Sequence, residues 1–241
     1  MCTLTLDSPH NRNALSSRLL AELADGLRDA TTDRGVRAIV VTGTGSVFCS
    51  GADLKERDRT GASRMPEILT ALTSSPAPVI VRVNGHARAG GLGLLAAADM
   101  AVAASASTFA FSEVRVGVAP ALILVPAQRV VGRRFLARAT LTGAPFTAEE
   151  AAQAGLLTAV VPDTGSLDAW VHGAISAILQ SAPGAVAATK ALLNELPDLS
   201  GAAGLAAAAA RSAELFAGAE AAEGMDAFVH KRRPAWDATA P

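Results

Sequence analysis

Residues 79–104 read VIVRVNGHARAGGLGLLAAADMAVAA, and this stretch decides the fold. It contains a β-branched run at 79–83, an Asn-Gly turn at 84–85, a glycine-opened helical segment at 90–98 and a second apolar run at 100–104. Short apolar runs of this kind predict buried strands, and the segment between them predicts a helix. The β-α-β order predicts an α/β fold with a largely parallel sheet and right-handed crossovers.

The alternation of strands and helices extends toward the N-terminus. Apolar residues at near-helical spacing predict a helix over 15–30, and a continuous β-branched run predicts a buried strand over 36–42. A glycine-rich loop follows, and 65–72 has the pattern of a further helix. Strands alternating with helices are what a layered α/β domain requires.

After about Gly117 the strand signals fade and helical patterns dominate. The segments are rich in alanine, whose small side chain suits close helix packing. The predicted helices span residues 127–141, 148–154, 168–180, 185–196 and 205–228. We therefore expect a core domain over 1–185 that contains the functional loops and a C-terminal helical region over 186–241.

Composition bears on the class of protein. The chain has 241 residues, half of them apolar, and a net charge of −1, so no basic excess points to nucleic acid. The two distant cysteines, Cys2 and Cys49, predict neither a disulfide framework nor a metal motif, and they favour a reducing cytoplasm. The N-terminus lacks the pattern of a signal peptide. The most apolar stretch, 92–111, contains Asp99 and reads as a buried helix and strand, so we expect no membrane partner.

Two loops rich in small residues each follow a predicted strand. In residues 47–56 (VFCSGADLKE), few bulky side chains cover the backbone N–H groups, and Asp53 is placed to cap a following helix. In residues 84–93 (NGHARAGGLG), glycines let a ligand approach the backbone, and a helix N-terminus favours developing negative charge. Each also fits a plainer alternative: an ordinary strand-to-helix loop for the first, and tight helix packing for the second. The glycines do not complete a dinucleotide-binding fingerprint.

A third segment, residues 109–120 (FAFSEVRVGVAP), places Glu113 among apolar residues. A partly desolvated carboxyl group has a raised pKa and can exchange protons near neutrality. The alternative is a salt bridge between Glu113 and Arg115 or another arginine. His86 and Cys49 fit no catalytic triad or nucleophile elbow, and no cluster has metal-ligand spacing, so we expect no metal.

Together and in order, these three loops resemble the crotonase (enoyl-CoA hydratase/isomerase) family. Residues 48–56 resemble its F-x-x-G-A-D-L-K-E motif, 83–99 its V-N-G-x-A-x-G-G-G-x-x-L-x-x-x-x-D motif, and 109–120 its F-x-x-P-E-x-x-x-G-x-x-P motif. Shorter similarities extend the resemblance to nearly the whole chain. They lie at residues 11–15, 141–143, 148–151, 155–156, 160–162, 181–183, 189–190 and 223–228.

The resemblance implies a spiral of β-β-α units with a C-terminal helical region used for trimerisation, in homotrimers or hexamers. It also implies an acyl-coenzyme A thioester as substrate, with no further cofactor. The backbone N–H groups of Ala52 and Gly90 would form an oxyanion hole that stabilises charge on the thioester oxygen. The residues implied in substrate binding are Gly51, Asp53, Leu54, Lys55, Gly91, Gly93 and Lys231. Either lysine is alternatively a plain solvated charge, and Lys231 would act from a neighbouring subunit.

Glu113 resembles the second of the family's two catalytic glutamates, whereas the first falls at Gly93. The preferred interpretation is a hydratase in which Glu113 alone activates water. Bacterial hydratases of methylglutaconyl-type thioesters, in leucine or isoprenoid breakdown, have patterns similar to residues 90–99 and 112–121. A 3,2-enoyl-CoA isomerase is the second interpretation, since one glutamate is sufficient to move a proton between two carbons. A catalytically weak acyl-CoA-binding member is the third.

Three further features limit what the resemblance implies. Arg88 and Arg115 bracket the site in sequence, and one of them could pair with a second carboxylate on the substrate; an interface or surface salt bridge is the alternative. The chain begins almost at the second strand of the family's opening hairpin, so we expect the first strand to be missing or to lie upstream. Residues 55–78, which shape the acyl pocket in the family, are fewer than in many relatives, so the acyl preference stays open.

Overall fold

The computed structural model describes residues 1–56, 64–195 and 200–237. Its larger sheet is parallel throughout, in the order β1-β2-β4-β6-β9. These strands span Cys2–Leu6 (β1), Ile39–Gly43 (β2), Val79–Val83 (β4), Met100–Ala104 (β6) and Ala159–Val161 (β9). The smaller sheet has the order β3-β5-β7-β8, in which β8 runs antiparallel to β7. Its strands span Val47–Cys49 (β3), His86–Arg88 (β5), Thr108–Ala110 (β7) and Phe146–Thr147 (β8).

Successive strands alternate between the two sheets. β2, β4 and β6 lie in the larger sheet, and the strands that follow them, β3, β5 and β7, lie in the smaller one. Helices α2 (Met65–Ser74) and α3 (Gly90–Ala97) return the chain to the larger sheet. After β7, the 3₁₀ helix η2 (Glu113–Val116) and α4 (Ala121–Val130) precede α5 (Arg133–Thr142) and β8, and α6 (Ala148–Gln153) then leads to β9 of the larger sheet. This repeated order confirms the predicted spiral of β-β-α units.

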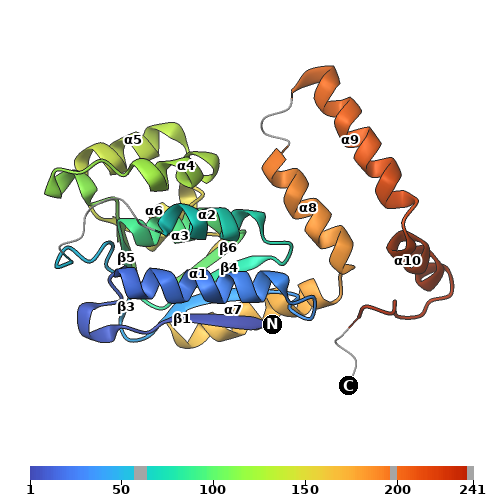
Figure 1. Ribbon diagram of the computed structural model, residues 1–241, viewed down its shortest axis with the longest axis horizontal. Helices are drawn as coiled ribbons and strands as arrows, with labels where there is room; N and C mark the ends of the chain where they lie inside the picture. Colours follow the sequence, from blue (N-terminus) through green and yellow to red (C-terminus); the bar gives the residue numbers. More distant parts are fainter. Residues whose placement is uncertain (57–63, 196–199, 238–241) are drawn as a thin grey trace.

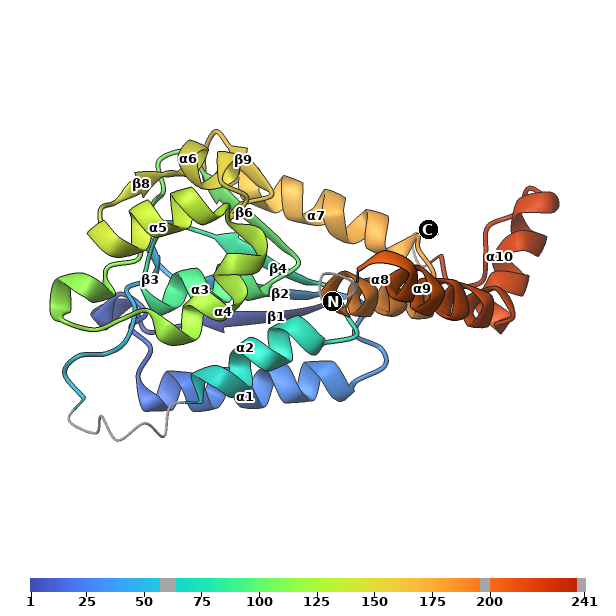
Figure 2. The same ribbon diagram turned by 90° about the horizontal axis from the view of Figure 1, so that it is seen from above.

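The larger sheet is covered on both faces, which explains its continuous apolar strands. Helices α1 (Ser17–Thr32) and α2 lie on one side of it and α7 (Gly165–Leu179) on the other (Figure 2). Successive side chains of a strand point to opposite faces. Val81 therefore packs in the main core, whereas its neighbour Ile80 packs with Val102 against α7.

The remaining helical elements of the core and its edge are η1 (Pro9–Asn11) and α8 (Pro183–Glu195).

The last two helices, α9 (Gly201–Phe216) and α10 (Ala219–Val229), form an arm that extends away from the sheets (Figure 1). In the described part of the arm, α9 buries only Gly204 and α10 only Ala227. Phe216 and Phe228 are 68% and 86% exposed. The last two helices thus bury little surface against their own chain.

Two predicted helices are each divided in the structure. The segment 127–141 contains the end of α4 and most of α5, because Gly132, with a ψ of 134°, leaves the helical conformation between them. The segment 205–228 is divided in the same way at Gly218, with a ψ of 158°, between α9 and α10. Leu196, at the end of a third predicted helix, lies outside the described residues.

Short strands lie where no strand was predicted. β8 and β9 both come after Gly117, so two short strands interrupt the predominantly helical region that was predicted there. β3, β5 and β7 have three residues each, too few for an alternating pattern to be visible. The division at residue 185 stays a prediction, and α8 runs across it.

A buried lysine joins α8 to the core. The Nζ atom of Lys190 lies 2.7 Å from Oδ2 of Asp99 and donates to the carbonyl of Leu72 at 2.8 Å. The same Asp99 oxygen accepts the N–H of Val79 at 2.7 Å. Asn194 adds a bond of 3.0 Å to the carbonyl of Thr73. Burial lowers the pKa of Lys190 and the Asp99 carboxylate opposes that shift. Side chains of α8 therefore satisfy carbonyls at the C-terminal end of α2.

Replacement of Lys190 by methionine is expected to destabilise the protein by about 3 kcal/mol, because it leaves a carboxylate partly buried without its cation. The free energy of unfolding from urea titration measures this. Arg18→Ala serves as the control, since Arg18 forms an exposed i,i+4 pair with Glu22 and should leave stability unchanged. Equal stability of K190M and the wild-type protein would contradict the role of this ion pair.

Candidate active site

The first loop is held by a buried asparagine that precedes α1. Asn13 is fully buried, and its Nδ2 donates to the carbonyls of Thr44 at 3.0 Å, Val47 at 2.8 Å and Phe48 at 3.2 Å. Its Oδ1 accepts the N–H of Ser8 at 2.8 Å. One side chain thus satisfies three carbonyls of the chain entering the loop. The role of Asn13 was not predicted, although residues 11–15 were noted as similar to the family.

The loop then passes Gly51 and Ala52 in an open conformation. Gly51 has a φ of 90°, which favours glycine, and its carbonyl accepts the N–H of Leu15 at 2.8 Å. Leu15 and Ala52 form an isolated parallel bridge. Ala52 is exposed, and no acceptor within the described residues binds its N–H group. This amide is therefore available to a ligand.

The second loop leads from β5 into α3 through a strained residue. Ala89 has φ 47° and ψ −120°, a conformation that few residues other than glycine adopt. Its N–H donates to the carbonyl of Ala110 at 2.9 Å, which fixes the turn. Gly90 follows as the first residue of α3, so its N–H has no acceptor inside the helix, and none occurs elsewhere in the described chain.

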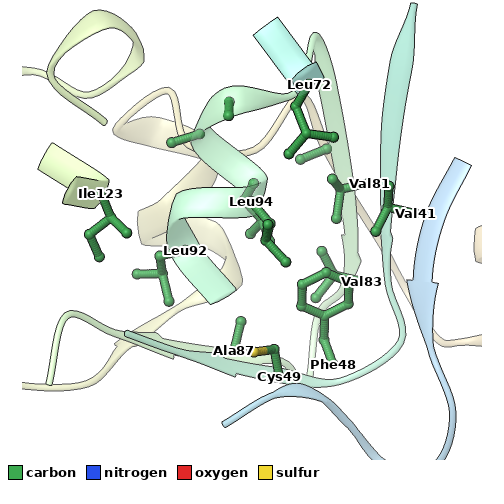
Figure 3. Close-up of a cluster of buried hydrophobic side chains, with 14 of the residues drawn as sticks. Val41, Phe48, Cys49, Leu72, Val81, Val83, Ala87, Leu92, Leu94 and Ile123 are labelled. Atoms are coloured by element: carbon green, nitrogen blue, oxygen red, sulfur yellow. The ribbon is translucent and has the colours of Figure 1, made fainter. Parts of the chain in front are cut away.

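The two loops are in contact through their glycines. A Cβ atom at Gly51 would lie 2.8 Å from the Cβ of Ala89, and one at Gly91 would lie 2.9 Å from the Cβ of Cys49. Figure 3 shows Cys49 and Ala87 side by side beneath α3. The chain segments that carry the Ala52 and Gly90 amides are thereby packed against each other, at the positive end of the α3 dipole.

Glu113 begins η2 and keeps a free carboxylate oxygen. Its Oε2 atom is buried and has no hydrogen-bond partner within the described residues. Burial raises the pKa of Glu113, as expected for a desolvated carboxyl group. The alternative of an ion pair with Arg115 is not realised, because the Nε of Arg115 donates to the carbonyl of Thr142 at 3.3 Å and its side chain packs on Gly143. An unpaired carboxyl group in a desolvated position can transfer protons.

The remaining residues predicted on the first loop have mixed positions. The expectation that Asp53 caps a helix is wrong: its Oδ1 accepts the N–H of Lys55 at 3.0 Å in a turn, and its Oδ2 accepts the side chain of Asn11 at 3.0 Å. Leu54 and Lys55 are exposed. Residues 57–63, in the segment expected to shape the acyl pocket, lie outside the described residues.

Lys231 is not brought to the first loop within one chain. It lies two residues beyond α10, which is at the end of the fold opposite the first loop (Figures 1 and 2).

Arg88 is engaged by the neighbouring strand. Its Nη1 donates to the carbonyl of Thr108 at 2.5 Å and its Nη2 to the hydroxyl of Thr108 at 2.8 Å. Burial lowers the pKa of Arg88. Both guanidinium groups considered for a substrate carboxylate, those of Arg88 and Arg115, thus already bind backbone carbonyls. Cys49 is fully buried, which raises the pKa of its thiol to about 12, so it remains protonated and packs in the core.

Ala89→Gly is expected to stabilise the protein by about 1 kcal/mol. Glycine removes a backbone strain of about 1–3 kcal/mol. Its larger conformational entropy in the unfolded chain offsets part of this stabilisation. Ala87→Gly is the matched control, because Ala87 is fully buried in β5 and should lose stability. A loss of similar size in A89G, measured by urea unfolding, would show that residue 89 is unstrained.

Comparisons with known proteins identify the family of this chain. The sequence matches the family described as Enoyl-CoA hydratase/isomerase over residues 1–239. It is 33% identical to the mitochondrial enoyl-CoA hydratase domain-containing protein 3 of Danio rerio, over 98% of this chain and 84% of that protein. It is also 33% identical to the 2,3-dehydroadipyl-CoA hydratase of Escherichia coli, over 96% and 92%.

Solved structures show the same likeness. The fold superposes on an enoyl-CoA hydratase of Mycobacterium smegmatis with a TM-score of 0.90 at 36% identity, covering 97% of this chain and 94% of the other. It superposes on AtuE of Pseudomonas aeruginosa with a TM-score of 0.91 at 33% identity, covering 98% and 95%. Within the described residues, no helix is both long and apolar enough to cross a bilayer. The chain belongs to the enoyl-CoA hydratase/isomerase family of enzymes.

Proposed function

We propose that this protein is an enoyl-CoA hydratase that adds water across the 2,3-double bond of short or branched enoyl-CoA thioesters, carboxylated ones included. The observation that carries the proposal is the buried, unpartnered Oε2 of Glu113, together with the free amides of Ala52 and Gly90. The relatives named above support hydration as the reaction.

Each group has one step in the proposed mechanism. The amides of Ala52 and Gly90 donate to the thioester oxygen, and donors of this kind are each worth about 3 kcal/mol at the transition state. The Glu113 carboxylate takes a proton from water as the water oxygen bonds to C3, and negative charge moves to the thioester oxygen. Protonated Glu113 then returns the proton to C2, which restores the carboxylate. A pKa raised by burial makes Glu113 a stronger base for the first step.

Coenzyme A is proposed to lie along the first loop, against Gly51, Asp53 and Leu54, with Gly91 and Gly93 beside the acyl end. Lys55, which is exposed, would contact a phosphate. Lys231 would supply its contact from a second subunit, because α10 lies far from the loop of its own chain. This arrangement therefore depends on assembly.

Assembly into a homotrimer, or a hexamer of two trimers, is supported by the exposed apolar side chains of the arm. Exposed apolar patches of this kind are typical of interaction sites, and here the side chains include Leu205, Phe216 and Phe228, which are 74%, 68% and 86% exposed. Another copy of the chain would cover them. Two unpaired thiols, Cys2 and Cys49, support a reducing cytoplasm as the compartment.

A 3,2-enoyl-CoA isomerase is the second candidate, and one observation favours it. Position 93 offers no carboxylate, and Ile123 and Met65 pack against the space over it. A single base is enough to move a proton from C2 to C4, whereas the proposed hydration also needs water beside Glu113.

The activity test follows the conjugated enoyl thioester absorbance with crotonyl-CoA and 3-methylglutaconyl-CoA. We expect the absorbance to fall, and the better substrate to indicate the acyl preference. If neither is consumed, the hydratase proposal is wrong. A gain of absorbance with a 3-enoyl-CoA would then identify an isomerase, and silence with all three would favour a binding protein.

Glu113→Gln is expected to lower kcat at least 100-fold, and wild-type kcat/KM should rise with pH through the raised pKa of Glu113 because the carboxylate is the base.

The same substitution is expected to increase the stability of the protein although it lowers its activity. Burial penalises the charged form, so E113Q should be more stable than wild type at neutral pH, and the difference should vanish below the ordinary glutamate pKa of about 4.3.

Glu149→Gln is the control for this experiment, because Glu149 is exposed, and it should change neither activity nor the pH dependence of stability. Urea unfolding at a series of pH values, beside the rate measurements, provides both readouts. Full activity in E113Q would remove Glu113 from the mechanism.

A further inference from the structure

The face of α3 that follows Gly90 is covered by apolar side chains from three other elements. Gly93 lies on this face, one turn beyond Gly90. The Cδ1 of Leu15 lies 2.8 Å from the place of a Cβ at Gly90, and the Cε of Met65 lies 3.9 Å from the same place. Met65 Cε is also 3.3 Å from a Cβ at Gly93. The backbone amide proposed to bind the thioester oxygen is therefore bordered by a continuous apolar wall.

Ile123 completes this wall at Gly93. Its Cγ2 lies 2.4 Å and its Cβ 3.0 Å from the place of a Cβ at Gly93. Figure 3 shows Ile123 reaching toward α3 from α4, near Leu92. Ile123 is 4% exposed. Even one methyl group at position 93 would have to displace it, so the glycine provides a hollow that the isoleucine fills.

The same short piece of chain carries Glu113 and Ile123. η2, which begins at Glu113, is followed through Pro120 by α4, whose first turn contains Ile123. The proposed acid/base and the end of the wall are thus positioned by consecutive elements. Gly93 follows Gly90 by three residues of α3, a rise of about 4.5 Å, so the wall at Gly93 lies close to the amide proposed to bind the thioester oxygen.

We propose that Ile123, seated on Gly93, is the residue that determines which acyl groups the site accepts. The proposal rests on the proposed function of the Gly90 amide. Ile123 fixes the volume of the wall beside the carbons nearest the thioester and keeps that wall apolar. It therefore limits branching at those carbons. Removal of its side-chain carbons beyond Cβ should admit a larger substituent, and one methylene in such a pocket changes discrimination by about 10- to 200-fold.

The test compares Ile123→Ala with the wild type on crotonyl-CoA and 3-methylcrotonyl-CoA. The ratio of kcat/KM for the branched over the straight thioester is expected to rise about 10-fold. Ile123→Val should shift it less in the same direction, and it provides a milder variant if the alanine protein folds poorly. The control is Ile175→Ala: Ile175 lies on α7, is 6% exposed, packs with Ile80 and Val102 of the large sheet, and should leave the ratio unchanged.

Dissociation constants for butanoyl-CoA and 3-methylbutanoyl-CoA, measured on the same proteins, separate this inference from the proposed function. A wild-type protein that hydrates neither thioester defeats the hydratase proposal, while the binding ratio still decides the role of Ile123. An unchanged ratio in I123A, by kinetics and by binding, overturns the inference.

A double-variant experiment tests the pairing of hollow and side chain directly. Gly93→Ala should lower Tm by several degrees in the wild-type background and much less in the Ile123→Ala background, because the clashing group is absent there. The same loss of Tm in both backgrounds would show that Ile123 does not occupy the hollow, and would overturn the inference.

Discussion

The close approach of Gly51 to Ala89 is the contact on which the site depends. Two loops that leave different strands of the small sheet can expose their amides to one ligand only if their backbones nearly touch. No side chain at position 51 would allow that approach, since a Cβ there would lie 2.8 Å from the Cβ of Ala89. The strained conformation of Ala89 is part of the same arrangement. The β-β-α spiral can be understood as the framework that brings these two loops together.

The strands and helices that carry strong sequence patterns were predictable. β4 and β6 were expected at the residues where they occur, because continuous apolar runs identify strands buried on both faces. The strands of the small sheet were not, because three residues are too few to show a period. The divisions at Gly132 and Gly218 were missed for a different reason: helical patterns flank both glycines, and a single glycine does not by itself end a predicted helix.

Some features of the site were likewise predictable from local sequence, and others were not. The uncovered backbone of the two loops could be inferred from their small residues, whereas the choice of Ala52 and Gly90 came from the resemblance to the family. The unpaired state of Glu113 agrees with its apolar neighbours in sequence. The parts contributed by distant segments could not be inferred. Asn13, Met65 and Ile123 reach the loops from elements far away in the chain, and nothing in their local sequence marks a contact with Phe48 or Gly93. The sequence shows that position 93 has no side chain, but it does not show that Ile123 occupies the space.

The ion pair between Lys190 and Asp99 marks where the chain can be cut. A protein that ended after Glu195 would lose Lys231 but keep Asn13 and Glu113, and it would retain the Lys190 contact that joins α8 to the core. A protein that ended before Lys190 would leave Asp99 beside the first residue of β4 without its cation. Cleavage beyond α8 would release α9 and α10, with loss of the bonds that Glu220 accepts from the N–H groups of Gly184 and Ala185 and of the bond that Trp236 donates to Gln180. The core therefore ends beyond the Lys190–Asp99 ion pair, whose lysine lies inside α8 and not at its first residue.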